Sequence, residues 1–327
     1  MLCELMITLE AGDALDHYRL DKMVARSGMS TLYRATDLKD GKQVAIKIPH
    51  EELEADPVLV ERFKREAEIG QELDHPGLVK AYNGEARSRN YMVIEWVDGR
   101  LLRSILNQHQ KLTIDRAVKL TLAICDALDY MHKHGVVHRD LKPENIMVGE
   151  QDRIKLIDFG IAMKEDARRL TYAGPSPLLG TPDYISPEQV KGRRGDGRSD
   201  LYTTGIMLYE MLSGKKPFSG DTPMAITNDR LLNHPLPPRE AEPSITPQLQ
   251  EVLYRALERD PVKRYATARQ FVWDLENLDK VGVEDRAELR EWRNRTSGTK
   301  RKAIFYVALA LIPFVLLGLM VLMMHRK

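Results

Sequence analysis

The sequence predicts an α+β fold with two lobes, a small strand-rich lobe followed by a larger helical lobe, and a separate apolar helix near the C-terminus. Residues 18–49 show strand-type patterns, residues 113–279 show helical periodicity, and residues 303–324 carry no charge. The 43% hydrophobic and 30% charged residues fit a folded globular protein. The net charge of +1 gives no indication of a nucleic-acid partner.

The first lobe is predicted over residues 16–97, after an N-terminal extension of residues 1–15. It contains one main helix at residues 57–73, "PVLVERFKREAEIGQEL", whose apolar residues recur at helical spacing. Alternating and β-branched residues predict strands on both sides of this helix, at residues 18–25, 30–37, 42–49, 78–86 and 90–97.

The second lobe is predicted over residues 100–279, because the periodicity becomes helical after the Asp98–Gly99 pair. Apolar residues three and four apart predict helices at residues 113–135, 199–214, 246–260 and 266–279. A polar, basic linker is expected over residues 280–302, and a short tail over residues 325–327.

The apolar segment 303–324 is long enough to cross a bilayer, because 22 helical residues extend about 33 Å and a bilayer core is about 30 Å thick. A buried core helix is the alternative, but such a helix rarely lacks a polar face. Arg293 and Arg295 favour a cytoplasmic location for the N-terminal side. The N-terminus has no pattern of a signal peptide. We therefore expect a single-pass anchor in an inner or plasma membrane, contacting lipid, with the large domain in the cytoplasm.

Four motifs follow one another along the chain: "VAIK" at 44–47, "HRDLKPEN" at 138–145, "IDFG" at 157–160 and "SPE" at 186–188. With these motifs the chain resembles the eukaryotic-like serine/threonine protein kinases of the membrane-anchored bacterial kind, over residues 16–279. The resemblance implies the two-lobed protein kinase fold, the use of ATP with Mg²⁺ or alternatively Mn²⁺, and protein substrates that carry serine or threonine.

The resemblance also implies roles for four polar residues of the second lobe. Asp140 would accept or orient the proton of the substrate hydroxyl, and Lys142, which is typical of serine/threonine kinases, would contact the transferring phosphate. Asn145 and Asp158 would bind Mg²⁺, which prefers carboxylate and amide oxygens.

In the first lobe, the resemblance assigns Lys47 to the α- and β-phosphates of ATP and Glu66 to an ion pair with Lys47. The remaining residues expected to contact the nucleotide are Val24, Ala25, Ser27, Gly28, Ser30, Leu32, Ala45, Glu95 and Val97.

The loop "VARSGMSTLYRATD" lacks the glycines of the family pattern G-x-G-x-x-G, which fall on Ala25, Ser27 and Ser30. A side chain at Ser27 would crowd the phosphates, or its hydroxyl would donate a hydrogen bond to them. Backbone strain at a non-glycine residue costs about 1–3 kcal/mol, so we expect a catalytically active kinase with weak ATP affinity, whose KM for ATP falls in Ser27→Gly. A pseudokinase that acts as a nucleotide-responsive scaffold remains the alternative.

The segment between "DFG" and "SPE" is expected to regulate the enzyme. Its candidate phosphorylation sites are Thr171, Ser176 and Thr181, although a structural role competes at Thr181. Membrane proximity also favours phosphorylation between copies, so a homodimer remains an open alternative, but the apolar helix carries one glycine and no small-xxx-small pattern built on two.

Three further residues are expected to be structural. The resemblance implies a buried ion pair between Glu188 and Arg264, whose breaking would cost about 3–5 kcal/mol. It also implies that Asp200 stabilises the backbone of the "HRD" loop.

Overall fold

The computed structural model describes residues 9–50, 56–82, 87–159, 163–164 and 183–286. The chain divides into one compact unit at residues 1–281 and a second at residues 282–327. The helices and strands named below belong to the first unit. The predicted phosphorylation sites Thr171, Ser176 and Thr181, and the predicted membrane helix 303–324, lie outside the described residues. Within the ranges that the structure describes, no helix is both long and apolar enough to span a bilayer.

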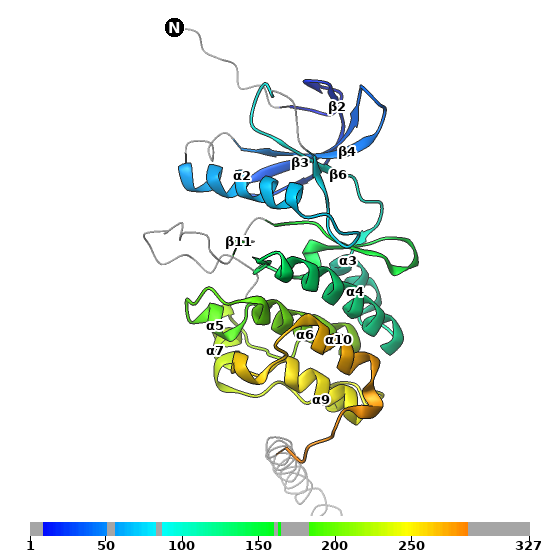
Figure 1. Ribbon diagram of the computed structural model, residues 1–327, viewed down its shortest axis with the longest axis vertical. Helices are drawn as coiled ribbons and strands as arrows, with labels where there is room; N and C mark the ends of the chain where they lie inside the picture. The colour runs from blue at the N-terminus through cyan, green and yellow to red at the C-terminus, as the bar shows by residue number, and fades with distance from the viewer. Residues whose placement is uncertain (1–8, 51–55, 83–86, 160–162, 165–182, 287–327) are drawn as a thin grey trace, which may run out of the picture. The chain divides into compact units, whose positions relative to one another are not determined.

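The first lobe contains a six-stranded sheet in the order β1-β2-β3-β4-β6-β5, with antiparallel pairing throughout. Leu20, Tyr33, Ala35 and Ile46 pack in a hydrophobic cluster on this sheet, because alternate side chains of a strand point to the same face. Figure 1 shows helix α2 (Pro57–Glu72) beside the sheet. The strands are β1 (Ala14–Leu15), β2 (Tyr18–Arg26), β3 (Ser30–Asp37), β4 (Gln43–Pro49), β5 (Ala81–Tyr82) and β6 (Met92–Glu95).

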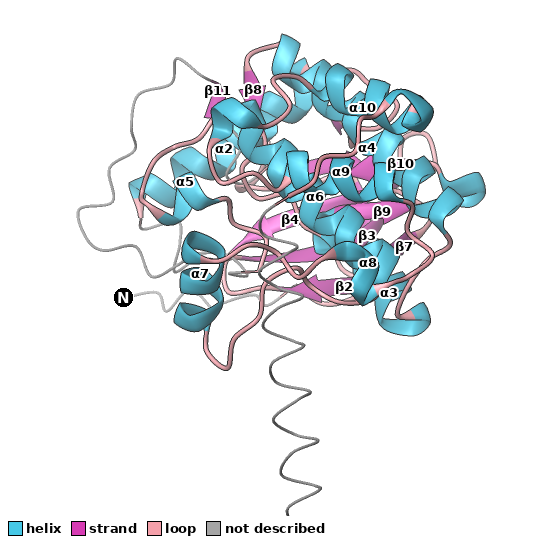
Figure 2. Ribbon diagram, turned by 90° about the horizontal axis from the view of Figure 1, so that it is seen from below, coloured by secondary structure: helices cyan, strands magenta, loops and turns pink. Residues whose placement is uncertain are grey.

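The second lobe is helical and is built around α6 (Gly197–Ser213), which is buried along almost its whole length. Figure 2 looks from below, through this lobe, toward the strands of the first lobe. Threonine side chains cap four of the helices by accepting a backbone N–H bond at the N-terminus. The other helices are α3 (Leu102–His109), α4 (Ile114–Lys133), α5 (Pro187–Val190), α7 (Pro223–Leu232), α8 (Pro238–Ala241), α9 (Pro247–Ala256) and α10 (Ala268–Glu276).

Short strands lie where the chain passes between the lobes. The hairpin of β9 (Ile146–Val148) and β10 (Ile154–Leu156) pairs with β7 (Arg100–Leu101), and β8 (Val136–Val137) pairs with β11 (Met163–Lys164). The turns η1 (Pro143–Asn145), η2 (Glu150–Asp152), η3 (Pro261–Lys263) and η4 (Leu278–Lys280) are 3₁₀-helical. Strands β8 and β9 flank the "HRDLKPEN" motif, and β10 directly precedes Ile157 and Asp158.

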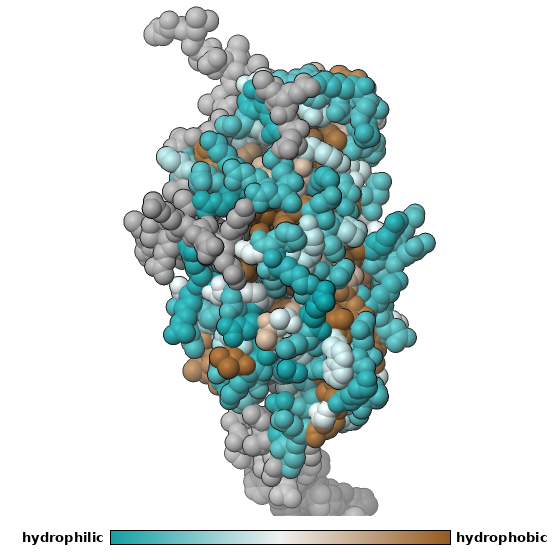
Figure 3. Space-filling view, in the orientation of Figure 1, coloured by the Kyte–Doolittle hydropathy of each residue, from teal (hydrophilic) through white to brown (hydrophobic). Residues whose placement is uncertain are grey.

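The predicted two-lobed α+β architecture is confirmed. The helix expected at residues 113–135 is α4, which begins after its N-cap residue Thr113, and the strands expected at residues 30–37 and 42–49 are β3 and β4. Helices α3, α5, α7 and α8 were not predicted. On the face seen in Figure 3, hydrophilic residues predominate and hydrophobic residues form small separate groups, as on an ordinary globular domain.

Candidate active site

Lys47 and Glu66 form an ion pair inside the first lobe. Lys47 lies in β4, opposite Leu32 of β3 and Met92 of β6, and its Nζ is 2.6 Å from Oε1 of Glu66 on α2. Oδ1 of Asp158 lies 3.7 Å from the same ammonium. Burial raises the pKa of Glu66 to about 7, although Lys47 opposes this shift. Burial favours the neutral amine of Lys47, but the two carboxylates outweigh it and raise the lysine's pKa. The ammonium is thus kept charged at the boundary with the second lobe.

The loop after β8 brings together three of the predicted catalytic residues. Nζ of Lys142 lies 2.7 Å from Oδ2 of Asp140. The side-chain amide of Asn145 donates to the backbone carbonyl of Asp140 at 2.8 Å. The ammonium of Lys142 therefore lies beside the Asp140 carboxylate, and Asn145 closes the loop that carries it. This arrangement fixes the carboxylate for proton transfer.

The β9–β10 hairpin explains why the two predicted metal ligands lie at the same edge. Asn145 directly precedes β9, Asp158 lies two positions after the end of β10, and Ile146 pairs with Leu156. Ile157 N donates to the carbonyl of Asn145 at 3.0 Å, which closes this end of the hairpin. Because the amide nitrogen of Asn145 is used by Asp140, its oxygen is the atom that suits a cation. One carboxylate and one amide oxygen fit Mg²⁺, which normally completes its shell with waters and substrate phosphates.

Asp200 on α6 accepts hydrogen bonds from two consecutive backbone amides of the catalytic loop, His138 N at 2.9 Å and Arg139 N at 2.8 Å. Arg139 has a φ of +66°, a region that is unfavourable for a residue with a side chain. Although burial disfavours a charged Asp200, the hydrogen bond from His132 and the bond from Arg139 N lower the pKa of this carboxyl. The buried carboxylate therefore stabilises a strained backbone next to Asp140.

Sequence reasoning missed two partners of this loop. His132 at the end of α4 contacts Asp200, with 2.8 Å between Nε2 and Oδ2. Gln189 on α5 donates from its side-chain amide to the carbonyl of Arg139 at 2.9 Å, while its oxygen accepts from the backbone N–H of Ser186. The spacing of Ser186 and Gln189 is a capping-box pattern, a signal that was present in the sequence.

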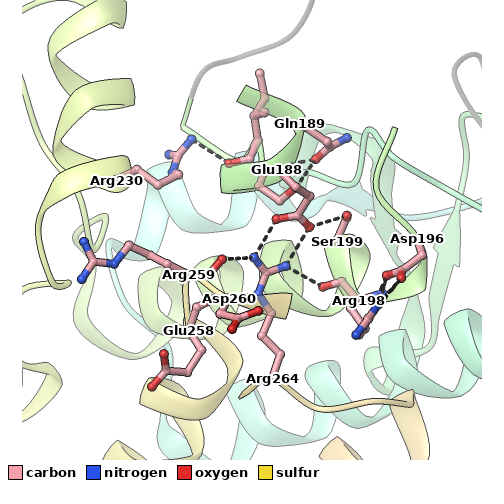
Figure 4. A network of polar contacts seen from close by, with 12 residues as sticks. Glu188, Gln189, Asp196, Arg198, Ser199, Arg230, Glu258, Arg259, Asp260 and Arg264 are labelled. Carbon is pink, nitrogen blue, oxygen red and sulfur yellow. Dashed lines mark hydrogen bonds and ion pairs between the residues drawn. The ribbon is translucent and has the colours of Figure 1, made fainter. Parts of the chain in front are cut away.

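Glu188 and Arg264 form a two-point ion pair with distances of 2.8 and 2.7 Å, drawn in Figure 4. The Arg264 side chain is 0% exposed. Its guanidinium also donates to three backbone carbonyls and lies over the ring of Tyr202, and Ser199 donates to Glu188 at 2.6 Å. Although burial disfavours the charged Glu188, Arg264 lowers the pKa of its carboxyl. This pair joins α5 to the turn η3 of the second lobe, whose next residue is Arg264.

The loop between β2 and β3 shows no sign of the strain that its composition suggested. Neither Ser27 nor Gly28 has a positive φ, and a Cβ added at Gly28 would meet nothing within 4 Å. The expectation of strain at Ser27 is therefore wrong, because this backbone does not need the left-handed conformations that favour glycine.

The other residues expected to contact a nucleotide lie on β2, β3, β4 and β6, except Val97, which follows β6. Ala45 is buried in β4, and Val24 of β2 is exposed. The carboxylate of Glu95 lies 2.6 Å from Nζ of Lys155, and Glu95 N donates to the carbonyl of Lys80. Val97 packs against the main hydrophobic cluster.

The site combines three features: a lysine–glutamate pair on a strand and a helix, an Asp–Lys–Asn cluster on a loop, and an aspartate after a hairpin. Together they define a phosphotransferase of the protein kinase class. The family model described as protein kinase domain matches residues 18–273. The chain therefore belongs to the protein kinase domain family. Its domain is of the bacterial type of ATP-dependent serine/threonine protein kinase.

Relatives and a solved structure agree with this assignment. The probable serine/threonine-protein kinase SCO3848 of Streptomyces coelicolor is 40% identical over 264 residues, which are 79% of this chain and 39% of that protein. The serine/threonine-protein kinase PknB of Mycolicibacterium smegmatis is 37% identical over 287 residues, 86% of this chain and 46% of that protein. The crystal structure of a mutant PknI kinase domain of Mycobacterium tuberculosis matches with a TM-score of 0.64 and 25% identity, covering 84% of this chain and 100% of that one. The chain thus spans less than half the length of these two curated relatives.

Proposed function

We propose that this chain is an active, membrane-anchored serine/threonine kinase that transfers the γ-phosphoryl group of ATP to protein hydroxyls, its own included. The observation that carries the proposal is the 2.6 Å pair between Lys47 and Glu66, with Asp158 at 3.7 Å from the same ammonium. It supports activity because phosphoryl transfer depends on positioning and on charge neutralisation at the phosphates.

The residues divide the reaction between them. The substrate oxygen forms a bond to the γ-phosphorus, the bond from that phosphorus to the β,γ-bridging oxygen breaks, and ADP leaves. The hydroxyl proton passes to Asp140, while Lys142, 2.7 Å from Asp140, meets the negative charge of the transferring group. Lys47 orients the α- and β-phosphates. Mg²⁺, held by Asn145 and Asp158, would neutralise phosphate charge when bound.

The test is incorporation of label from γ-labelled ATP into the full chain in detergent micelles with Mg²⁺, with sites mapped by mass spectrometry. We expect label on serine or threonine, Thr171 and Ser176 among the first sites, and its loss in Asp140→Asn. Asp279→Asn, an exposed carboxylate in η4 outside the site, is the matched control and should keep the label. Absence of label in a folded chain that binds ATP would favour the pseudokinase alternative.

The proposed anchor is the uncharged segment 303–324. The expected result is that the chain stays in the membrane pellet after alkaline carbonate extraction. Leu311→Arg together with Leu316→Arg should release it, because each arginine at the centre of a membrane helix costs about 2.5–3.5 kcal/mol on the translocon insertion scale. Recovery of the unsubstituted chain in the supernatant would contradict the anchor.

A further inference from the structure

The hydroxyl of Ser27 is bonded to the backbone of its own loop. Its Oγ accepts from the amides of Met29 at 3.2 Å and Ser30 at 3.1 Å, and lies 3.1 Å from the carbonyl of Ser30, to which it donates. Ser27 N also donates to that carbonyl at 2.9 Å. One side chain therefore satisfies two adjacent backbone donors at the end of the β2–β3 hairpin.

Those two donors belong to the part of the loop that faces phosphate in the proposed reaction. Successive backbone N–H groups in a tight turn form a concavity that binds anions, and a kinase loop of this kind covers the nucleotide's phosphates. A phosphate oxygen that takes the Met29 and Ser30 amides has to displace the hydroxyl of Ser27. Glycine or alanine at this position has no oxygen that could occupy them.

We infer that Ser27 is an affinity-setting residue whose hydroxyl competes with the phosphate oxygens of ATP and ADP for the amides of Met29 and Ser30. This inference rests on the proposed function, because it takes the loop to be the phosphate-covering element of a kinase. The effect comes from the hydroxyl oxygen of Ser27 rather than from crowding of the phosphates by its side chain. Ser27 has no positive φ, so removing its side chain relieves no backbone strain.

The distinction between a hydroxyl effect and a size effect decides the choice of variants. Ser27→Ala removes the oxygen and keeps Cβ, Ser27→Gly removes both, and Ser27→Thr keeps the hydroxyl. If the hydroxyl is the competitor, alanine and glycine behave alike and threonine behaves like serine. If bulk matters, the affinity falls steadily from glycine to alanine to serine to threonine, and if backbone flexibility matters, only glycine differs.

The experiment measures dissociation constants of Mg²⁺·ADP and of adenosine for the full chain and the three variants by isothermal titration calorimetry. We expect Ser27→Ala and Ser27→Gly to bind ADP about 3- to 10-fold more tightly, because the phosphate then no longer breaks two modest hydrogen bonds, one exposed and one partly buried. Adenosine has no phosphate, so its affinity stays unchanged in all variants, and Ser27→Thr stays near the unsubstituted chain.

Weaker ADP binding in Ser27→Ala would overturn the inference and show that the hydroxyl preorganises the loop instead. Unchanged ADP binding would overturn it by showing that the hydroxyl does not compete with phosphate. Equal tightening for adenosine, or tightening in Ser27→Gly alone, would also overturn it. The proposed function is judged separately, by label transfer and its loss in Asp140→Asn, so the failure of one leaves the other measurable.

Discussion

The Glu188–Arg264 pair makes a prediction whose size follows from its contacts. Removing one partner of a buried ion pair typically costs about 3–5 kcal/mol, because the remaining charge stays buried without compensation. The two residues differ in how many hydrogen bonds each keeps when its partner is removed. In Arg264→Met, the hydroxyl of Ser199 is the one side-chain donor that Glu188 keeps among the described residues, so we expect a loss of about 4 kcal/mol in the free energy of unfolding.

The reverse substitution, Glu188→Gln, leaves Arg264 better supported. The guanidinium still donates to the carbonyls of Glu258, Arg198 and Arg259 and still faces Tyr202 at 4.6 Å. The glutamine oxygen also remains an acceptor. We therefore expect a smaller loss, about 2 kcal/mol, near the value for a hydrogen bond to a charged group.

A double-mutant cycle tests both numbers. Urea unfolding followed by the fluorescence of the three tryptophans gives the free energy for each variant, provided the slopes stay equal. The double variant should cost no more than about 4 kcal/mol, less than the sum of the two single losses, because neither charge is then buried without its partner. Additive losses, or a larger loss from Glu188→Gln than from Arg264→Met, would refute the reasoning.

Three further predictions concern pH and catalysis. The pKa of Glu188 is lowered from 4.5, so the carboxylate stabilises the fold above about pH 4.5, and this stabilisation is lost as the pH falls through the lower folded-state pKa. Below pH 4.5, the free energy of unfolding should therefore change less with pH in Glu188→Gln than in the unsubstituted chain. Identical pH dependence of the two proteins would contradict this. Asp200→Asn should lower kcat about 10- to 100-fold with little change in the KM for ATP, since the strained Arg139 loses a charged acceptor; steady-state kinetics check it, and an unchanged kcat would count against it. Lys47→Met should lower kcat/KM at least about 100-fold while the circular dichroism spectrum stays the same, and activity within tenfold of the unsubstituted chain would show that another cation serves the phosphates.

Periodicity and caps predicted the fold to within a few residues where elements are long. Residues 113–135 became α4 at Ile114–Lys133, because its apolar residues recur at three and four and Thr113 supplies the cap. Helix α3 is only eight residues long, and its buried Leu102, Ile105 and Leu106 give less than two turns of pattern. Such a short segment is decided by tertiary packing rather than by its own propensity.

The site was predictable in its residues but not in its supporting contacts. The family resemblance assigned Lys47 and Glu66 to an ion pair, and the structure places their charged atoms 2.6 Å apart although the two residues are 19 positions apart in the chain. No motif of the loop itself shows that Gln189 reaches the carbonyl of Arg139, because that contact depends on how α5 lies against the catalytic loop. Every residue has a backbone carbonyl, so the type of residue at position 139 does not show that a side chain such as that of Gln189 binds there.

The glycine-poor loop shows why composition alone could not decide between an active and an inactive nucleotide site. Missing glycines matter only where the backbone needs a positive φ or a close approach, and here neither Ser27 nor Gly28 adopts a positive φ. The substitution that matters is therefore not the loss of flexibility but the gain of an oxygen that binds the loop's own amides. With serine in place of glycine, the amides of Met29 and Ser30 already have a hydrogen-bond partner. A phosphate must exchange those bonds for its own, and an exchange of this size weakens nucleotide binding without preventing phosphoryl transfer.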